Sequence, residues 1–220
     1  WFSKNYLIAY KDFRNNPYYL PPTKEAAGKL KELEKEKNDI YFDSWLFRNP
    51  VGLQKYRKEI MEYFKPRQDI WEVVEIQINK LRDKFKNIIG VHVRQGDYKT
   101  WRGGTYFIPQ KRVREILDEY LKTSEGNKMN TCFVITSDEE IDTNLFSGLN
   151  IFVSKENAVH DLFLLAKTDT IIGSNSTFGA FASYYGNIPF IVMQKEKVDW
   201  NYYLNKKSYF ENKYSTFVFY

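Results

Sequence analysis

The chain has 220 residues, a formal net charge of +5 and a single cysteine, and 18% of its residues are aromatic. This composition excludes a disordered chain, an intrachain disulfide and a cysteine zinc cluster, and the length fits one large domain or two small ones. A lone cysteine, Cys132, fits a reducing compartment such as the cytoplasm. We expect no transmembrane helix and no signal peptide. Because the chain begins with Trp1 rather than Met, a segment upstream is expected to be missing.

The positive charge lies in the N-terminal part. Residues 1–87 contain 18 Lys and Arg against 13 Asp and Glu, whereas residues 88–220 contain 15 of each. Such an excess is compatible with nucleic acid, an anionic membrane surface or an acidic substrate. The bases alternate with acids, however, as in KLKELEKEK, which is typical of a solvated helix face. No nucleic-acid-binding signature is present, so we expect no nucleic-acid partner.

Residues 1–87 predict a mostly helical part. Thr23 can cap a charged helix, and Pro66 separates two later helical patterns. The expected elements are a loop over 15–22, a helix over 23–37, a short strand or aromatic turn over 39–47, and helices over 52–64 and 69–85.

From residue 88 onward, apolar strands alternate with helices. Unbroken apolar strands of this kind indicate a parallel sheet covered on both faces, so residues 88–220 predict a Rossmann-like α/β domain. Its strands are expected at 88–94, 131–136, 150–154, 169–174 and 188–193. The helices between them are expected at 109–122, 138–146, 158–167 and 176–185.

Polar residues follow three of these strands. Open parallel sheets bind ligands at the carboxyl ends of their strands, so these residues are candidates for one site. They are Arg94, Gly96 and Asp97 after the first strand, Ser137 and Asp138 after the second, and Ser174, Asn175, Ser176 and Thr177 after the fourth.

The stretch HVRQGDY admits two readings. Arg94 offers a fork of donors suited to a phosphate, and His92 could hydrogen-bond a base or a sugar. Gly96 lets the backbone approach a ligand, and Asp97 could accept a proton or a sugar hydroxyl. The alternative is an internal pair between Arg94 and Asp97 beside a core histidine. The spacing favours neither.

Two further stretches have plain structural readings. In GSNSTFGAF, Ser176 and its neighbours could bind an anion at a helix N-terminus, although simple helix capping explains the pattern as well. In HDLFLLAKTD, Asp161 suits the positive end of the helix dipole, and His160 is expected to be exposed. No GxGxxG, P-loop, HExxH or GxSxG motif is present, so these residues indicate no dinucleotide, P-loop, zinc or esterase site.

Taken together, VHVRQGDY, FVITSDEE and DLFLLAKTDTIIGSNSTFGAFAS resemble three ordered motifs of the GDP-fucose-dependent fucosyltransferases. The closest resemblance is to the bacterial α1,2-fucosyltransferases of glycosyltransferase family 11, which carry HxRxGDY, an SDD-like strand end and an NSSF-type turn. The similar span is about residues 88–190. The resemblance implies the nucleotide-binding half of a GT-B glycosyltransferase, with residues 1–87 as a remnant of the acceptor-side domain plus linker helices.

The resemblance also implies roles for individual residues. Arg94 corresponds to the arginine that holds the β-phosphate of GDP-fucose, and Asp161 to an acid that reads the guanine N–H edge. Asp97 corresponds to a carboxylate near the fucose and is a candidate for acceptor activation. The remaining expected contacts to the GDP-sugar come from His92, Gly96, Asp138, Ser174, Asn175, Ser176 and Thr177. The family inverts the anomeric centre and needs no metal, so no cofactor is expected.

Three departures from the family pattern are present. Gln95 stands where the α1,2 group usually has a second basic residue, and the glycine-rich GGxGNQ segment is absent. The loop over 99–107 contains no Asp or Glu. Its Trp101, Tyr106 and Phe107 could stack on an acceptor sugar or pack the loop onto the core.

The resulting functional hypothesis is transfer of fucose from GDP-fucose to a glycan or lipid-linked oligosaccharide in bacterial polysaccharide synthesis. The expected location is the cytoplasm, with the inner face of the membrane as a possible site of peripheral association. The alternatives are a transferase for another GDP-sugar and a truncated module that binds nucleotide or glycan without catalysis.

Overall fold

The structure is a computed structural model that describes residues 6–9, 40–43, 50–123 and 125–204. The chain divides into two compact units, one made of Trp1–Ile60 with Phe219–Tyr220 and the other of Met61–Val218. In the N-terminal part, β1 (Tyr6–Ala9) pairs in parallel with β2 (Ile40–Asp43). The helices α2 (Pro50–Lys55) and α3 (Arg57–Tyr63) follow.

The N-terminal predictions have mixed outcomes. The strand option for 39–47 is confirmed over 40–43, whereas β1 at 6–9 was not predicted. The single helix predicted over 52–64 is two helices that meet at Tyr56. The predicted helix over 23–37 lies outside the described residues.

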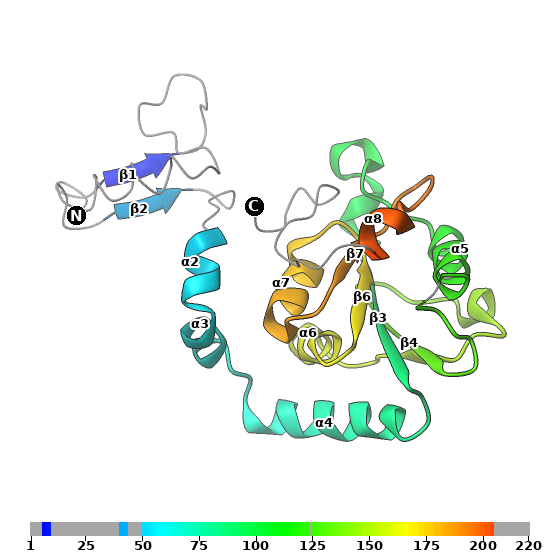
Figure 1. Cartoon of the computed structure of the whole chain (residues 1–220). Helices are drawn as coiled ribbons and strands as arrows, with labels where there is room; N and C mark the ends of the chain where they lie inside the picture. Colours follow the sequence, from blue (N-terminus) through cyan, green and yellow to red (C-terminus); the bar gives the residue numbers. More distant parts are fainter. Residues whose placement is uncertain (1–5, 10–39, 44–49, 124, 205–220) are drawn as a thin grey trace. The chain divides into compact units, whose positions relative to one another are not determined.

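The second unit contains the predicted parallel sheet (Figure 1). Its strand order is β5-β4-β3-β6-β7, and all neighbouring pairs are parallel. The strands are β3 (Asn87–Val93), β4 (Thr131–Ser137), β5 (Ile151–Val153), β6 (Thr170–Gly173) and β7 (Phe190–Val192). The α-helices are α4 (Gln68–Arg82), α5 (Gln110–Leu121), α6 (Ala158–Ala166), α7 (Thr177–Gly186) and α8 (Trp200–Leu204). Short 3₁₀ turns are η1 (Asp97–Lys99), η2 (Trp101–Gly104) and η3 (Thr143–Phe146).

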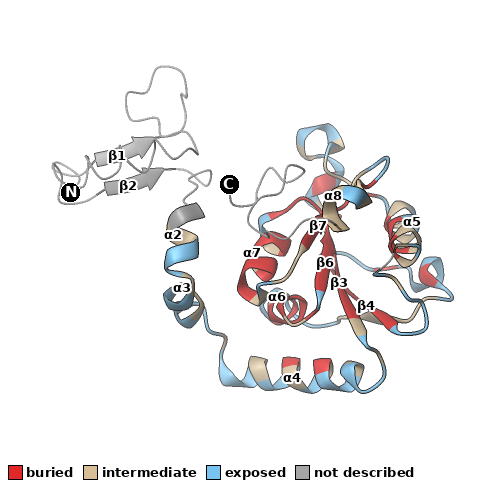
Figure 2. Cartoon of the chain, viewed as in Figure 1, coloured by how far each residue is buried: buried red, intermediate tan, exposed pale blue. Residues whose placement is uncertain are grey.

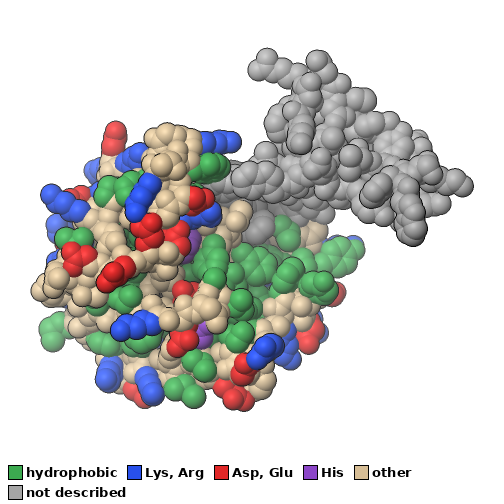
Figure 3. Space-filling model, turned by 180° about the vertical axis from the view of Figure 1, so that it is seen from behind, with side chains coloured by type: hydrophobic (Ala, Val, Ile, Leu, Met, Phe, Trp, Pro, Cys, Tyr) green, Lys and Arg blue, Asp and Glu red, His purple; other side chains and the backbone are tan. Residues whose placement is uncertain are grey.

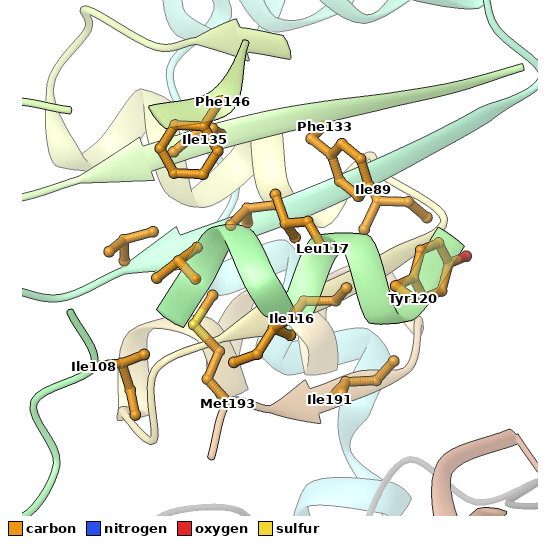
Figure 4. Close-up of a cluster of buried hydrophobic side chains, with 14 of the residues drawn as sticks. Ile89, Ile108, Ile116, Leu117, Tyr120, Phe133, Ile135, Phe146, Ile191 and Met193 are labelled. Carbon is orange, nitrogen blue, oxygen red and sulfur yellow. The ribbon is translucent and has the colours of Figure 1, made fainter. Parts of the chain in front are cut away.

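The alternation of side chains along β3 and β4 gives the sheet two apolar faces. Ile89 and Val91 of β3 and Phe133 and Ile135 of β4 belong to a core cluster with Ile116, Leu117 and Tyr120 of α5 (Figure 4). The intervening Ile88, Cys132 and Val134 belong to a second cluster with residues of α4, α6 and α7. Both faces are therefore covered, so β3, β4, β6 and β7 are mostly buried, whereas the edge strand β5 is only partly buried (Figure 2).

Cys132 behaves as a small buried apolar residue. It is 2% exposed, and burial raises the pKa of its thiol to about 11. A thiol in that state is a weak nucleophile, so Cys132 is suited to packing rather than to chemistry.

The predicted helix over 138–146 is wrong for most of its length. Only Thr143–Phe146 is helical, as η3, and its start is capped by Asp142, which accepts from the amide of Asn144. The preceding residues turn instead, because the Ser137 hydroxyl accepts from the Glu139 amide and the Asp138 carboxylate is bound to another loop. These local side-chain bonds compete with helix formation.

Gly90 lies at the centre of β3, where a side chain has no room. A Cβ there would be 2.8 Å from both Leu165 Cδ2 and Thr168 Oγ1. We expect Gly90→Ala to lower the free energy of unfolding by about 1–3 kcal/mol, since both neighbours are buried and must shift. Urea unfolding of the purified protein measures this change. As a control, Ile76→Ala on the exposed side of α4 should change it by less than about 0.5 kcal/mol.

Candidate functional site

A cavity of about 370 Å³ lies at the carboxyl ends of β3 and β4. The start of α6 and the first turn of α7 complete its walls. It is lined by His92, Arg94, Thr136, Ser137, Asp138, Glu156, Ala158, Asp161 and Phe178. The strand order reverses between β3 and β6. Open parallel sheets bind ligands at the carboxyl ends of the strands beside such a point.

The loops that follow β3 and β6 are joined by hydrogen bonds. The Ser174 amide donates to the carbonyl of His92, and the Arg94 amide donates to the Ser174 hydroxyl, both at 2.9 Å. The Tyr98 hydroxyl donates to the Asn175 carbonyl at 2.7 Å. Burial raises the pKa of Tyr98 to about 12, so this donor keeps its proton. Ser174 and Asn175 are buried and do not line the cavity; they fix the two loops that do.

Arg94 lies at the cavity wall and is held by two neighbours. Its Nε and Nη2 atoms donate to the two oxygens of Asp97 at 2.9 and 2.8 Å. Its guanidinium also lies over the Tyr98 ring, 4.6 Å from the centroid. The pair with Arg94 lowers the pKa of Asp97 and raises that of Arg94. Of the two readings of HVRQGDY, the internal pair is therefore present, and it is present on a cavity-lining arginine.

His92 forms part of the cavity floor. It is 7% exposed and stacks on Phe178, with ring centroids 4.9 Å apart and an angle of 28° between the planes. Its Nδ1 atom is buried and has no hydrogen-bond partner among the described residues. Burial lowers the pKa of His92 to about 4, so the ring is neutral at pH 7 and can both donate and accept.

Asp138 shapes the loop after β3. Its two oxygens accept from the amides of Gln95 and Gly96, at 2.7 and 3.2 Å. A Cβ at Gly96 would lie 3.0 Å from Asp138 Oδ2, so a glycine suits this close approach. Gln95 is buried and donates to the Ile108 carbonyl at 2.8 Å. Its side chain thus packs inside the loop, where a second basic residue was expected from the family pattern.

The start of α6 carries a buried carboxylate. Asn157 caps the helix by accepting from the amides of Val159 and His160. Asp161 is 7% exposed, lines the cavity and accepts a hydrogen bond from the Ser154 hydroxyl. Burial raises the pKa of Asp161. The expectation that His160 is exposed is wrong, because α6 packs against α4 and α7 and buries this side chain to 3%.

The N-terminus of α7 opens at the same sheet edge. Ser176 is its N-cap and accepts from the Phe178 amide at 3.1 Å, so the capping interpretation is present. Thr177 follows as the first helical residue and is exposed. Other amides of a first helical turn lack partners within the helix and attract anions. Neither Ser176 nor Thr177 is among the residues that line the cavity.

The aromatic residues of the loop over 98–107 pack on one another. Trp101 stacks on Tyr98 and on Tyr106, with centroids 5.5 and 5.2 Å apart. Arg102 lies over the Trp101 ring, 5.0 Å from the centroid. The loop therefore packs through its own rings, while Trp101, Tyr106 and Phe107 stay partly exposed.

Four cavity-lining residues were not predicted from the sequence, and one of them is the small apolar Ala158 at the start of α6. Thr136 and Phe178 read as core positions of a strand and a helix, and Glu156 reads as a loop acid. The period-two pattern of β4 could have found Thr136, because it continues the face of Cys132 and Val134.

Among the described residues, no group of three or more His, Cys, Asp or Glu could hold a metal ion. None of the described helices is long and apolar enough to cross a membrane.

Comparisons with known proteins agree with the motif resemblance. The sequence model of Glycosyl transferase family 11 matches residues 35–217. Structures of the α-1,6-fucosyltransferase NodZ, one soaked with GDP-fucose and one co-crystallized with GDP, are each 20% identical, with TM-scores of 0.53 and 0.51. Each covers 76% of this chain, and the chain covers 60% and 59% of them. A Se-Met structure of NodZ from Bradyrhizobium is 18% identical with a TM-score of 0.52, covering 80% of this chain and 62% of that one.

These structures confirm the expected fold, and the chain spans about three fifths of their length. No curated protein sequence matches the chain.

Burial of His92 predicts a loss of stability in acid. Its pKa in the fold is about 4, below the ordinary 6.5, so the unfolded chain binds this proton more readily. The contribution of the neutral His92 ring to the free energy of unfolding is complete above pH 6.5 and is lost as the pH falls toward 4. We expect His92→Gln to remove about 3 kcal/mol of that loss, measured by urea unfolding across this range. The same measurements on His160→Gln separate the contribution of the second histidine from that of His92. Identical pH curves for wild type and His92→Gln would contradict the assignment.

Proposed function

Because the chain belongs to glycosyltransferase family 11, we propose that it transfers fucose from GDP-fucose to a glycan acceptor. The observation that carries this proposal is the cavity at the sheet edge, whose lining combines the Arg94 fork with the buried carboxylate of Asp161. A guanidinium suits a diphosphate, and a carboxylate suits the two N–H donors of a guanine edge. One NodZ structure was co-crystallized with GDP and another was soaked with GDP-fucose, and both have TM-scores above 0.5.

In this proposal the donor lies along the carboxyl ends of the strands. Asp161 accepts from the guanine edge, and neutral His92 contacts the nucleotide beside Phe178. Arg94 binds the β-phosphate, and the N-terminus of α7 with Ser176 and Thr177 faces the phosphates. Gly96 brings the backbone close to the donor, and Asp138 holds that turn through two amides. Ser174 and Asn175 contribute by fixing the loops.

The proposed reaction inverts the anomeric centre and uses no metal. The acceptor hydroxyl attacks C1 of fucose and gives its proton to Asp97 as the new C–O bond forms. The bond from C1 to the phosphate oxygen breaks, and its electron pair leaves on GDP. Arg94 and the α7 N-terminus stabilise the charge that develops on the leaving diphosphate. These groups supply the positive potential that a metal ion supplies in other transferases.

The acceptor side of the proposal rests on fewer observations. We assign Trp101 and Tyr106 to the acceptor because their partly exposed rings lie beyond Tyr98, the residue under Arg94. Residues 88–220 form the GDP-sugar-binding domain in this proposal, and residues 1–87 belong to the acceptor side. A glycan or lipid-linked oligosaccharide of a bacterial surface polysaccharide is the proposed acceptor, used in the cytoplasm at the inner face of the membrane.

Two other functions compete with this one. The groups around the nucleotide do not identify the hexose, so another GDP-sugar is an alternative donor. The second alternative is a module that binds nucleotide or glycan without turnover, and the feature that favours it is the lack of the glycine-rich GGxGNQ segment in the printed sequence. Nucleic acid binding is not supported, since the basic residues of the N-terminal part alternate with acids, as in KLKELEKEK. On the face shown in Figure 3, Lys and Arg also lie among Asp and Glu.

Calorimetry with GDP, ADP and UDP, with and without EDTA, tests the nucleotide half of the proposal. We expect GDP alone to bind with unchanged affinity in EDTA, and Asp161→Asn to weaken GDP binding by about 10- to 100-fold, because it loses charged hydrogen bonds to guanine. Glu140→Gln removes an exposed carboxylate outside the cavity and should leave the affinity unchanged. Equal binding of the three nucleotides would contradict a GDP-sugar site.

A further inference from the structure

Arg94, which binds the donor's phosphate in the proposed function, is paired with the carboxylate of Asp97. Asp97 takes the Nε and Nη2 edge of Arg94 through two hydrogen bonds of 2.9 and 2.8 Å. Carboxylate and phosphate oxygens match this edge of a guanidinium with the same two-point geometry. A phosphate that takes this edge must therefore displace Asp97.

The two partners of this pair are not held equally firmly. Arg94 has two contacts that do not involve the Asp97 side chain: its amide donates to Ser174, and its guanidinium lies over Tyr98. Tyr98 is 2% exposed and is fixed by its bond to the Asn175 carbonyl. The Asp97 side chain is 54% exposed and belongs to the short turn η1. Asp97 is thus the partner that can leave while the guanidinium stays in place.

Two other acidic groups near Arg94 are bound elsewhere. Asp138 accepts from the amides of Gln95 and Gly96, and Glu139 pairs with Lys99. His92 is neutral and does not compete for a phosphate. Exposed ion pairs contribute little to stability, so opening the pair between Arg94 and Asp97 costs little compared with bonds to a diphosphate of higher charge.

We propose that Asp97 is an internal competitor of the donor's diphosphate: it holds Arg94 through these two hydrogen bonds and is released when the donor binds. This inference rests on the proposed function, since it takes a nucleoside diphosphate as the ligand of Arg94. Its consequence is an order of binding. While paired, Asp97 is a poor proton acceptor, and only the donor-bound enzyme has a free carboxylate for the acceptor hydroxyl. The donor therefore binds before the acceptor is activated.

The GDP affinity of Asp97→Asn tests this inference, because the inference predicts that the affinity rises relative to the wild type. A competitor weakens phosphate binding, so removing its charge should tighten GDP binding by about 3- to 10-fold at low salt, and less at high salt. Guanosine, which has no phosphate, should bind both proteins equally. Glu139→Gln is the matched control, because it removes a neighbouring carboxylate that does not touch Arg94, and it should leave GDP binding within about twofold.

The background of Arg94→Ala separates this inference from the proposed function. Arg94→Ala alone should weaken GDP binding by about 10- to 100-fold, and adding Asp97→Asn should then give no gain. If Arg94→Ala binds GDP normally, the phosphate role itself is wrong. A second outcome is that Arg94→Ala binds GDP weakly while Asp97→Asn binds GDP no more tightly than the wild type. If the melting temperature of Asp97→Asn is also unchanged, Asp97 does not compete for Arg94. A gain that persists without Arg94, or that Glu139→Gln reproduces, would equally overturn the inference. Asp97→Ala, which removes the hydrogen bonds as well as the charge, should tighten GDP binding in the same direction.

Discussion

The pairing of β3 with β4 on one side and β6 on the other is the constraint on which the candidate site depends. It makes β3 a core strand along most of its length and a wall of the cavity at its end. The ladder continues past the strands, because the Ser174 amide and hydroxyl bind the backbone of His92 and Arg94. Arg94 therefore leaves the strand at a fixed position, and the α7 N-terminus starts beside it.

Close packing between α7 and the sheet depends on two glycines. A Cβ at Gly173 would lie 2.8 Å from the Phe190 ring and 3.3 Å from His92 Cβ. A Cβ at Gly179 would lie 3.0 Å from the same ring and 3.3 Å from His92 Nδ1. Without these side chains the helix comes near enough for Phe178 to stack on His92. The glycines of GSNSTFGAF thus serve the packing that buries His92, and that burial keeps the ring neutral.

Sequence reasoning predicted the features that follow from local pattern. Apolar strands and polar strand ends located the sheet and the site edge, since both depend on the order of residues along one segment. It could not predict contacts between segments. Asp138 suppresses the helix expected over 138–146 by binding amides of a loop 43 residues earlier. His160 is buried because two other helices cover α6. The pair of Arg94 and Asp97 was one of two open readings, because spacing does not reveal which partner an arginine has.

Several charges of the candidate site are satisfied internally, and this bears on what the site can bind. Arg94 is paired with Asp97, and Asp138 with two amides. Asp161 differs from these residues: burial raises its pKa, and its hydrogen bond comes from the neutral hydroxyl of Ser154. A ligand edge with N–H donors relieves that desolvation, whereas an edge with acceptors adds repulsion. Under the proposed function, selectivity at this end of the cavity comes from the cost of burying Asp161, and binding strength at the other end comes from the exchange of Asp97 for phosphate at Arg94.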